Sequence, residues 1–153
     1  MNILYSDKYM IVCIKPAGVL SEEGGMPEML AKECGGEIFC VHRLDRAAGG
    51  LMVYARSKKA ASALSALISG GALEKEYLAV VPDKLQEESG RFEDLLFHDR
   101  GKNRSYIVRR ERGGVKKAVL EYRRLGSASS LALVRIRLIT GRTHQIRCQF
   151  AGR

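Results

Sequence analysis

The chain has 153 residues, which is enough for one core, so we expect a single domain over residues 1–153. Hydrophobic residues make up 46% and charged residues 28%, a balance that excludes a disordered tail or a fibre, and no apolar run has the roughly 20 residues of a membrane span. The formal net charge is +9 and is concentrated at one end, with 15 basic and 3 acidic side chains among residues 99–153, which indicates a nucleic-acid partner rather than a merely solvated surface.

Short runs of β-branched and apolar residues, each ended by Pro or Gly, predict strands in the first third of the chain. Pro27 opens and Gly35 closes a short helical segment between two of these strands. In chain order the expected elements are a strand at 9–15, a helix at 27–34, a strand at 37–41 and a strand at 50–56.

A longer helix follows Ser57, whose side chain is a favourable N-cap, and it ends at Gly70-Gly71. Its apolar residues recur at three- and four-residue spacings, so one stripe has to cover a sheet. The remaining elements are strands at 73–81, 117–124 and 130–138 and a helix at 143–150, with Thr143 as its N-cap. In the strand at 130–138 apolar residues alternate with Arg135 and Arg137, so one face belongs to the core and the other to solvent.

Strands outnumber helices, and several are joined by connections too short for a helical crossover. The expected fold class is therefore α+β, with a mixed, mainly antiparallel sheet flanked by helices. The N-terminus lacks the basic-then-apolar layout of a secretory signal, so we expect a cytoplasmic protein. We also expect a monomer that does not contact a membrane. None of the four cysteines forms a C-x-x-C pair, so we expect neither a disulfide nor a metal site.

The densest polar cluster in an apolar stretch is His42-Arg43-Leu44-Asp45-Arg46, between two predicted strands. Loops held between rigid strands often carry function. Arginines on both sides favour the charged form of Asp45, as a nucleophile or a general base requires. The alternative is an ion-paired carboxylate in a structural turn, and the local sequence does not separate the two.

A second polar cluster, at 140–147, places His144 and Arg147 three residues apart, on one face if the segment is helical. A helix N-terminus with nearby cations, here Arg142 and Arg147, is suited to anions, and the planar fork of an arginine holds both oxygens of a carboxylate. The structural alternative is a strand-to-helix turn with solvated arginines.

The third cluster is Lys75-Glu76-Tyr77, in the predicted strand at 73–81. Strand alternation sends Lys75 and Tyr77 to the same face. A tyrosine beside a basic group can stack on a nucleic-acid base, and the alternative is an ordinary core position.

Four motifs follow one another in the chain: Lys15-Pro16-Ala17-Gly18, His42-Arg43-Leu44-Asp45-Arg46, Lys75-Glu76-Tyr77 and Gly141-Arg142-Thr143-His144-Gln145-Ile146-Arg147. Together they span most of the sequence, which resembles the RluA-type branch of the pseudouridine synthases. The resemblance implies conversion of selected uridines to pseudouridine in structured ribosomal or transfer RNA. In that reaction the N-glycosidic bond breaks, and the uracil turns and rejoins the ribose through carbon 5. The resemblance also implies that no cofactor and no metal is needed.

By the same resemblance Asp45 is the catalytic aspartate, Arg147 is its charge partner, and Tyr77 packs against the target base and assists proton removal at carbon 5. Whether Asp45 attacks the ribose, attacks the ring or removes a sugar proton stays open. Arg43 matches the arginine that helps to hold the flipped nucleotide. The other polar residues expected at the RNA are His42, Arg46, Lys75, Arg142 and His144. Flipping a base out of its stack costs free energy, and stacking on an aromatic side chain offsets part of that cost.

The chain departs from the family pattern at three places. Ala48-Gly49 stands where Thr-Ser is usual, which removes two hydroxyls and adds backbone freedom. Ser21-Glu22 replaces a His-Pro. Family members continue beyond Gly152-Arg153, and many carry a small N-terminal RNA-binding domain, so we expect a C-terminally truncated catalytic domain without that extra domain.

Two other functions fit parts of the sequence. The first is a non-catalytic RNA-binding module on the same fold, which an Asp45→Asn exchange distinguishes from an enzyme. The second is a hydrolase that uses His42 or His144 with Asp45, but no nucleophile elbow or metal-ligand spacing accompanies these histidines. The pseudouridine synthase is the hypothesis that the sequence favours.

Overall fold

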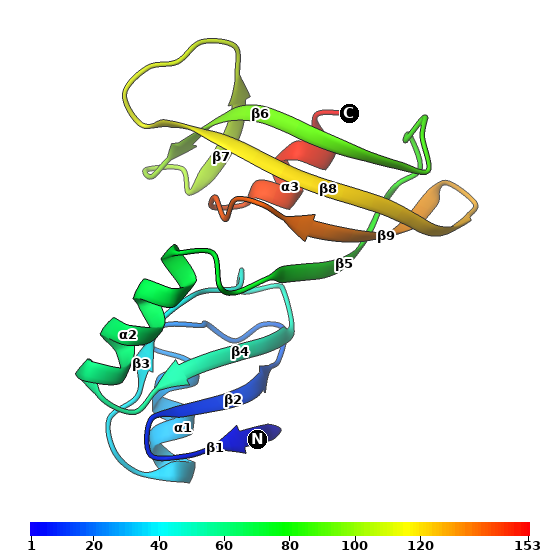
Figure 1. Cartoon of the computed structure of the whole chain (residues 1–153). Coiled ribbons are helices and arrows are strands. Elements are labelled where there is room, and N and C mark those ends of the chain that lie inside the picture. Colours follow the sequence, from blue (N-terminus) through cyan, green and yellow to red (C-terminus); the bar gives the residue numbers. More distant parts are fainter. The chain divides into compact units, whose positions relative to one another are not determined.

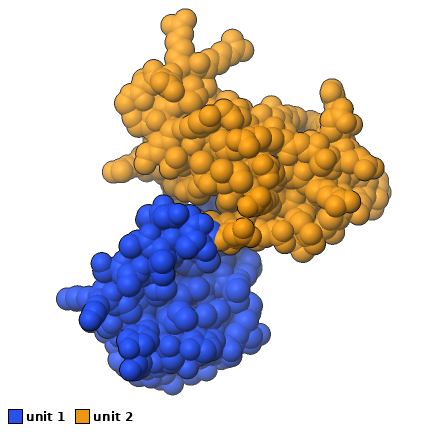
Figure 2. Space-filling view, viewed as in Figure 1, with its two compact units in different colours: residues 1–73 blue, residues 74–153 orange.

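A computed structural model describes all 153 residues and divides them into two compact units, Met1–Leu73 (unit 1) and Glu74–Arg153 (unit 2) (Figure 2). Each unit has its own antiparallel sheet (Figure 1). Each also has its own hydrophobic core. The α+β class is confirmed, although every pair of neighbouring strands is antiparallel where a mixed sheet was expected. That the whole chain acts as one catalytic domain stays a prediction.

Unit 1 contains a four-stranded sheet in the order β1-β2-β4-β3. Its elements are β1 (Ile3–Ser6), β2 (Met10–Lys15), α1 (Met26–Cys34), β3 (Phe39–Cys40), β4 (Gly50–Ala55) and α2 (Lys58–Ser69). Alternation along β2 and β4 turns one set of side chains to the face that α1 covers. The residues that are fully buried there are Ile11, Cys13, Met26, Leu30, Met52 and Tyr54.

The helices of unit 1 begin and end close to where the sequence predicts. Ser57 is confirmed as the N-cap of α2, because its Oγ accepts the backbone N–H of Ala60 at 3.1 Å. The expected strand at 37–41 is reduced to the two residues of β3, and β1 was not predicted because most of its side chains are exposed and show no alternation.

Unit 2 contains a five-stranded sheet in the order β5-β9-β8-β6-β7. Its elements are β5 (Lys75–Pro82), β6 (Ser89–Asp99), β7 (Arg104–Val108), β8 (Val115–Ala128), β9 (Leu131–Leu138) and α3 (Gln145–Ala151). Helix α3 packs on one face of this sheet (Figure 1), where the Phe150 ring lies 5.1 Å from that of Phe92 and 5.9 Å from that of Tyr122. None of the three helices has the length and apolar composition needed to cross a membrane.

The alternation expected for β9 is confirmed, since Val134 and Ile136 are fully buried while Arg135 and Arg137 are exposed. Strands β6 and β7 were missed by the sequence analysis. In β6 the charged residues Arg91, Glu93 and Asp94 interrupt the apolar ones, and the exposed Arg91 and Glu93 pair with residues of β8 across the sheet. Arg91, for example, lies 3.5 Å from Glu121 of β8.

Candidate functional site

Asp45 is half-buried in the loop that joins β3 to β4 in unit 1. The loop leaves the sheet after Cys40, and the side chain of His42 then takes over a backbone contact that a longer β3 would make. Its Nε2 accepts the N–H of Val53 in β4 at 3.0 Å. This ring nitrogen of His42 therefore supports the loop as an acceptor. That His42 also contacts the RNA stays a prediction.

Lys15 is the centre of this loop's polar contacts, and its side chain is fully buried at the end of β2. Its ammonium donates to the carbonyls of Pro16 (2.9 Å), Val19 (2.8 Å) and Arg46 (3.4 Å). Burial lowers the pKa of Lys15, and the negative charge of Asp45 opposes that shift. Lys15 therefore joins the Pro16-Ala17-Gly18 turn to the Asp45 loop and places a positive charge within range of the carboxylate.

Three hydrogen bonds on the C-terminal side of Asp45 strengthen this junction, two between backbone groups and one from the Arg46 side chain. Gly18, in a left-handed conformation with φ 88°, donates its N–H to the Arg46 carbonyl at 2.7 Å, and Arg46 Nε donates to the Gly18 carbonyl at 2.8 Å. The Ala48 N–H donates to the Asp45 carbonyl at 2.9 Å and closes a turn. A backbone hydrogen bond from Ala48 thus closes the loop just after Asp45.

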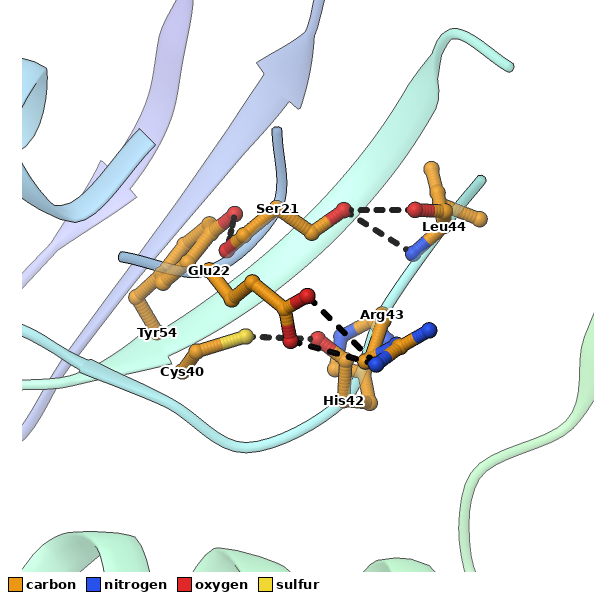
Figure 3. Close-up of polar contacts among 7 residues, drawn as sticks. All are labelled: Ser21, Glu22, Cys40, His42, Arg43, Leu44 and Tyr54. Atoms are coloured by element: carbon orange, nitrogen blue, oxygen red, sulfur yellow. Dashed lines mark hydrogen bonds and ion pairs between the residues drawn. The ribbon is translucent and has the colours of Figure 1, made fainter. Parts of the chain in front are cut away.

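On the N-terminal side of Asp45, a short segment that includes Ser21 and Glu22 lies along the loop (Figure 3). The Ser21 hydroxyl donates to the Leu44 carbonyl (2.8 Å) and accepts the Leu44 N–H (3.0 Å). Arg43, the residue expected to hold the nucleotide, forms an ion pair with Glu22 at 3.2 Å, and both side chains are at least half exposed. This arginine therefore already has an anionic partner.

In unit 2, Lys75 and Tyr77 lie on the same face of β5, as alternation predicted, and both are half-buried while Glu76 and Leu78 are exposed. Tyr77 packs against the unit 2 core while it stays partly exposed, and its contact with the target base stays a prediction. The Lys75 ammonium lies against Gly141 in the turn after β9. The space is so close that a Cβ at position 141 would be 3.3 Å from Lys75 Nζ.

That turn is organised by Gln145, which is almost fully buried. Its Oε1 accepts hydrogen bonds from the Thr140 hydroxyl (2.8 Å) and from the Arg142 N–H (2.9 Å). Its Nε2 donates to the carbonyl of Val119 in β8 at 3.1 Å. Arg142 is half-buried and its Nε donates to the Lys117 carbonyl at 2.9 Å, so part of its guanidinium fixes the turn to β8.

The start of α3 differs from the sequence prediction. The helix begins at Gln145 and its N-cap is His144, so Thr143 as N-cap is wrong. His144 has φ 53° and ψ 27°, a left-handed conformation that turns the chain sharply from the Gln145-centred turn into the helix. His144 and Arg147 therefore do not share one continuous helical face. Arg147 is exposed in the first turn of α3.

The four motifs are thus joined in pairs within the units. In unit 1 the Lys15 motif lies against the loop that carries His42, Arg43, Asp45 and Arg46, and in unit 2 the Lys75-Glu76-Tyr77 strand lies against the turn that carries Arg142 and His144. The sequence analysis gave no individual role to three residues that hold these arrangements: Lys15, Ser21 and Gln145. The inward position of Lys15 had a signal, since it continues the alternation of Ile11 and Cys13 along β2.

Comparison with known proteins identifies the fold. Residues 9–152 match the sequence model of the RNA pseudouridylate synthase family. The chain belongs to this family. Among solved structures, a human protein described as RNA pseudouridylate synthase domain containing 4 superposes with a TM-score of 0.77 at 27% identity, over 99% of this chain and 64% of the human chain.

Curated family members are similar at the level of sequence. The uncharacterized RNA pseudouridine synthase YhcT of Bacillus subtilis is 32% identical over 99% of this chain and 54% of its own length. The ribosomal large subunit pseudouridine synthase D of Xanthomonas campestris is 33% identical over 99% of this chain and 48% of its own length. The chain therefore spans about half the length of the curated relatives that it matches.

Proposed function

We propose that this chain is a catalytic domain that converts selected uridines of structured RNA to pseudouridine. The match to the family over residues 9–152 carries the proposal. In the reaction the bond between N1 and C1′ breaks, a bond between C5 and C1′ forms, the hydrogen at C5 leaves as a proton, and N1 gains one. Pseudouridine is an isomer of uridine, so the reaction has no net change of oxidation state and needs no external oxidant or reductant.

In this proposal Asp45 is the essential catalytic group, and it acts as a nucleophile or as a general base in its ionised form. The loop contacts of Lys15, Ser21 and Arg46 support this role, because a reacting group has to be held in place before the substrate arrives. Tyr77 packs against the target base and Arg147 is the charge partner of Asp45, both by family resemblance. Arg43, Lys75, Arg142 and His144 contact the RNA.

The charge of unit 2 supports RNA as the substrate. Residues 99–117, which run from the end of β6 through β7 to the start of β8, hold eight basic and two acidic side chains. The Arg112 guanidinium lies 4.8 Å from the centre of the Phe97 ring, and that of Arg104 lies 5.5 Å from Tyr106. Arginines held on aromatic rings present cations to phosphates in a defined place. Ribosomal RNA and transfer RNA are the two substrate classes to be tested.

We expect a double exchange, Arg109→Gln with Arg110→Gln, to weaken RNA binding and to flatten its dependence on salt. Both side chains are exposed between β7 and β8. Each lost phosphate contact lowers the slope of log Kd against log salt by about 0.7 to 0.9. Filter binding at several salt concentrations measures this slope. The matched control is Lys58→Gln with Lys59→Gln, an exposed pair on α2, and equal slopes for the two double variants would contradict the prediction.

Glu22→Gln is expected to tighten RNA binding by up to about fivefold, because it removes the carboxylate that pairs with Arg43. An exposed ion pair of this kind contributes about 0–1 kcal/mol, which sets the upper limit of the gain. Glu23→Gln removes the same charge one residue along the chain and serves as the control. If both variants bind RNA more tightly to the same extent, the gain comes from net charge alone. The prediction that Arg43 gains contact with RNA when Glu22 is removed would then be contradicted.

The test of the proposed function is isomerisation of RNA labelled with tritium at carbon 5 of uridine. Formation of the C5 to C1′ bond expels the label, so release of tritium into water counts turnovers. We expect release from ribosomal or transfer RNA, with pseudouridine located afterwards by mass spectrometry. Binding of RNA without release from either class would instead favour a non-catalytic RNA-binding module, which the basic segment 99–117 also fits.

A further inference from the structure

Ser21 has a place in the structure that the family pattern does not assign to it. Its side chain is 3% exposed, and its single hydroxyl bonds both backbone groups of Leu44 (Figure 3). A hydroxyl has one proton to donate and lone pairs to accept, so it can satisfy the Leu44 carbonyl and the Leu44 N–H together. Leu44 immediately precedes Asp45.

Ser21 is itself anchored to the unit 1 core. The hydroxyl of Tyr54, a residue with no exposed surface, donates to the Ser21 carbonyl at 2.9 Å. Burial raises the pKa of Tyr54, so its hydroxyl stays protonated and remains a donor. The residues that follow Ser21 form a closed turn, because the Met26 N–H at the start of α1 donates to the Leu20 carbonyl at 2.9 Å.

Asp45 consequently lies between two fixed points of the backbone. Arg46, which follows it, has its carbonyl bound by Gly18 and Lys15, and Leu44, which precedes it, has both backbone groups bound by Ser21. The contact at Leu44 is made by a side chain, so it can be removed by a single substitution without changing the main chain of the loop.

We propose that Ser21 is a positioning residue of the proposed reaction, which holds Leu44 and thereby fixes where the Asp45 carboxylate stands. The inference rests on the proposed function. Ser21 restrains the residue before Asp45, whereas Ala48-Gly49 follows Asp45 in the chain. Displacement of a reacting group by about 1 Å can lower a rate by about a hundredfold, so a contact one residue away from Asp45 is close enough to matter.

The experiment compares Ser21→Ala with Ser57→Ala. Each removes one serine hydroxyl from unit 1, but Ser57 caps α2 and has no contact with Leu44. We expect Ser21→Ala to lower the single-turnover rate of pseudouridine formation by about ten- to a hundredfold while the RNA Kd changes less than about twofold. Ser57→Ala should leave both within about twofold of the original chain.

Hydrogen exchange supplies a readout that does not depend on turnover. In Ser21→Ala the amide of Leu44 loses its acceptor, so exchange in the peptide over residues 42–46 should accelerate at least tenfold, and Ser57→Ala should leave it unchanged. If Ser21→Ala does not fold, Tyr54→Phe decides. It removes only the hydroxyl bound to Ser21 and should produce the same changes in exchange and rate at smaller amplitude.

The outcomes separate this inference from the proposed function. If the original chain is active and Ser21→Ala turns over at the same rate as Ser57→Ala, the positioning role of Ser21 is overturned. The proposed enzymatic function would then still stand. Fast exchange at 42–46 with an unchanged rate also overturns the positioning role, because the loop would then be loosened without consequence for Asp45. An original chain that releases no tritium overturns the proposed function instead, whatever the exchange data show.

Discussion

Asp45→Asn is expected to reduce pseudouridine formation by about 100- to 10,000-fold, because an amide neither attacks carbon nor accepts a proton as a carboxylate does. Asn has nearly the same shape as Asp, so the loop contacts at Leu44, Arg46 and Ala48 should persist. RNA affinity should therefore be no weaker than that of the original chain. Single-turnover tritium release measures the first quantity, and filter binding measures the second.

The matched control for this exchange is Asp7→Asn. Asp7 also lies in unit 1, where its Oδ1 accepts the N–H groups of Tyr9 and Met10 in the turn between β1 and β2. An amide oxygen can accept the same hydrogen bonds, so Asp7→Asn should keep full activity. An Asp45→Asn protein that turns over at the original rate would remove Asp45 from the mechanism, although the family membership of the chain would stand.

Lys15→Met is expected to lower the free energy of unfolding by about 2–4 kcal/mol. Met fills a similar volume but donates nothing, so the carbonyls of Pro16, Val19 and Arg46 lose a donor inside the loop assembly. Buried groups that lose a hydrogen-bonding partner retain the full penalty of their removal from water. Urea unfolding followed by circular dichroism gives the change from the midpoint and slope of the transition.

Lys32→Met is the control, because Lys32 is exposed on α1 and its replacement should change stability by no more than about 0.5 kcal/mol. Equal stability of the two variants would show that the Lys15 ammonium contributes no more than a surface lysine. Because the Arg46 carbonyl follows Asp45 by one residue, we also expect Lys15→Met to slow turnover under conditions where it remains folded.

The fold was predictable where local pattern and burial agree. The alternation of Ile11 and Cys13, and the N-cap at Ser57, are local signals that the tertiary structure preserves. Strand β6 escaped prediction because Arg91 and Glu93 interrupt its apolar residues. Those charges are compatible with a strand because Glu121 and Lys117 lie across the sheet and pair with them. Such partners are distant in the sequence, so a local pattern does not reveal them.

The candidate site was predictable as a set of motifs but not as an arrangement. The order of the motifs led to the family, yet nothing local indicates that Lys15 binds the Arg46 carbonyl 31 residues away, or that Ser21 binds Leu44. The N-cap at Thr143 was wrong for a related reason. Gln145 anchors the preceding turn to Val119 of β8, and this distant contact decides where α3 can begin.

His144 adopts a backbone conformation that suits glycine better than histidine. The left-handed region costs a residue with a Cβ about 1–2 kcal/mol, so the unit that contains His144 is less stable than the same unit with glycine at this position. For protein engineering, position 144 is one at which a glycine should raise thermal stability. In the proposed function His144 contacts the RNA, so the same exchange should lower RNA affinity, and stability and binding would then favour different residues.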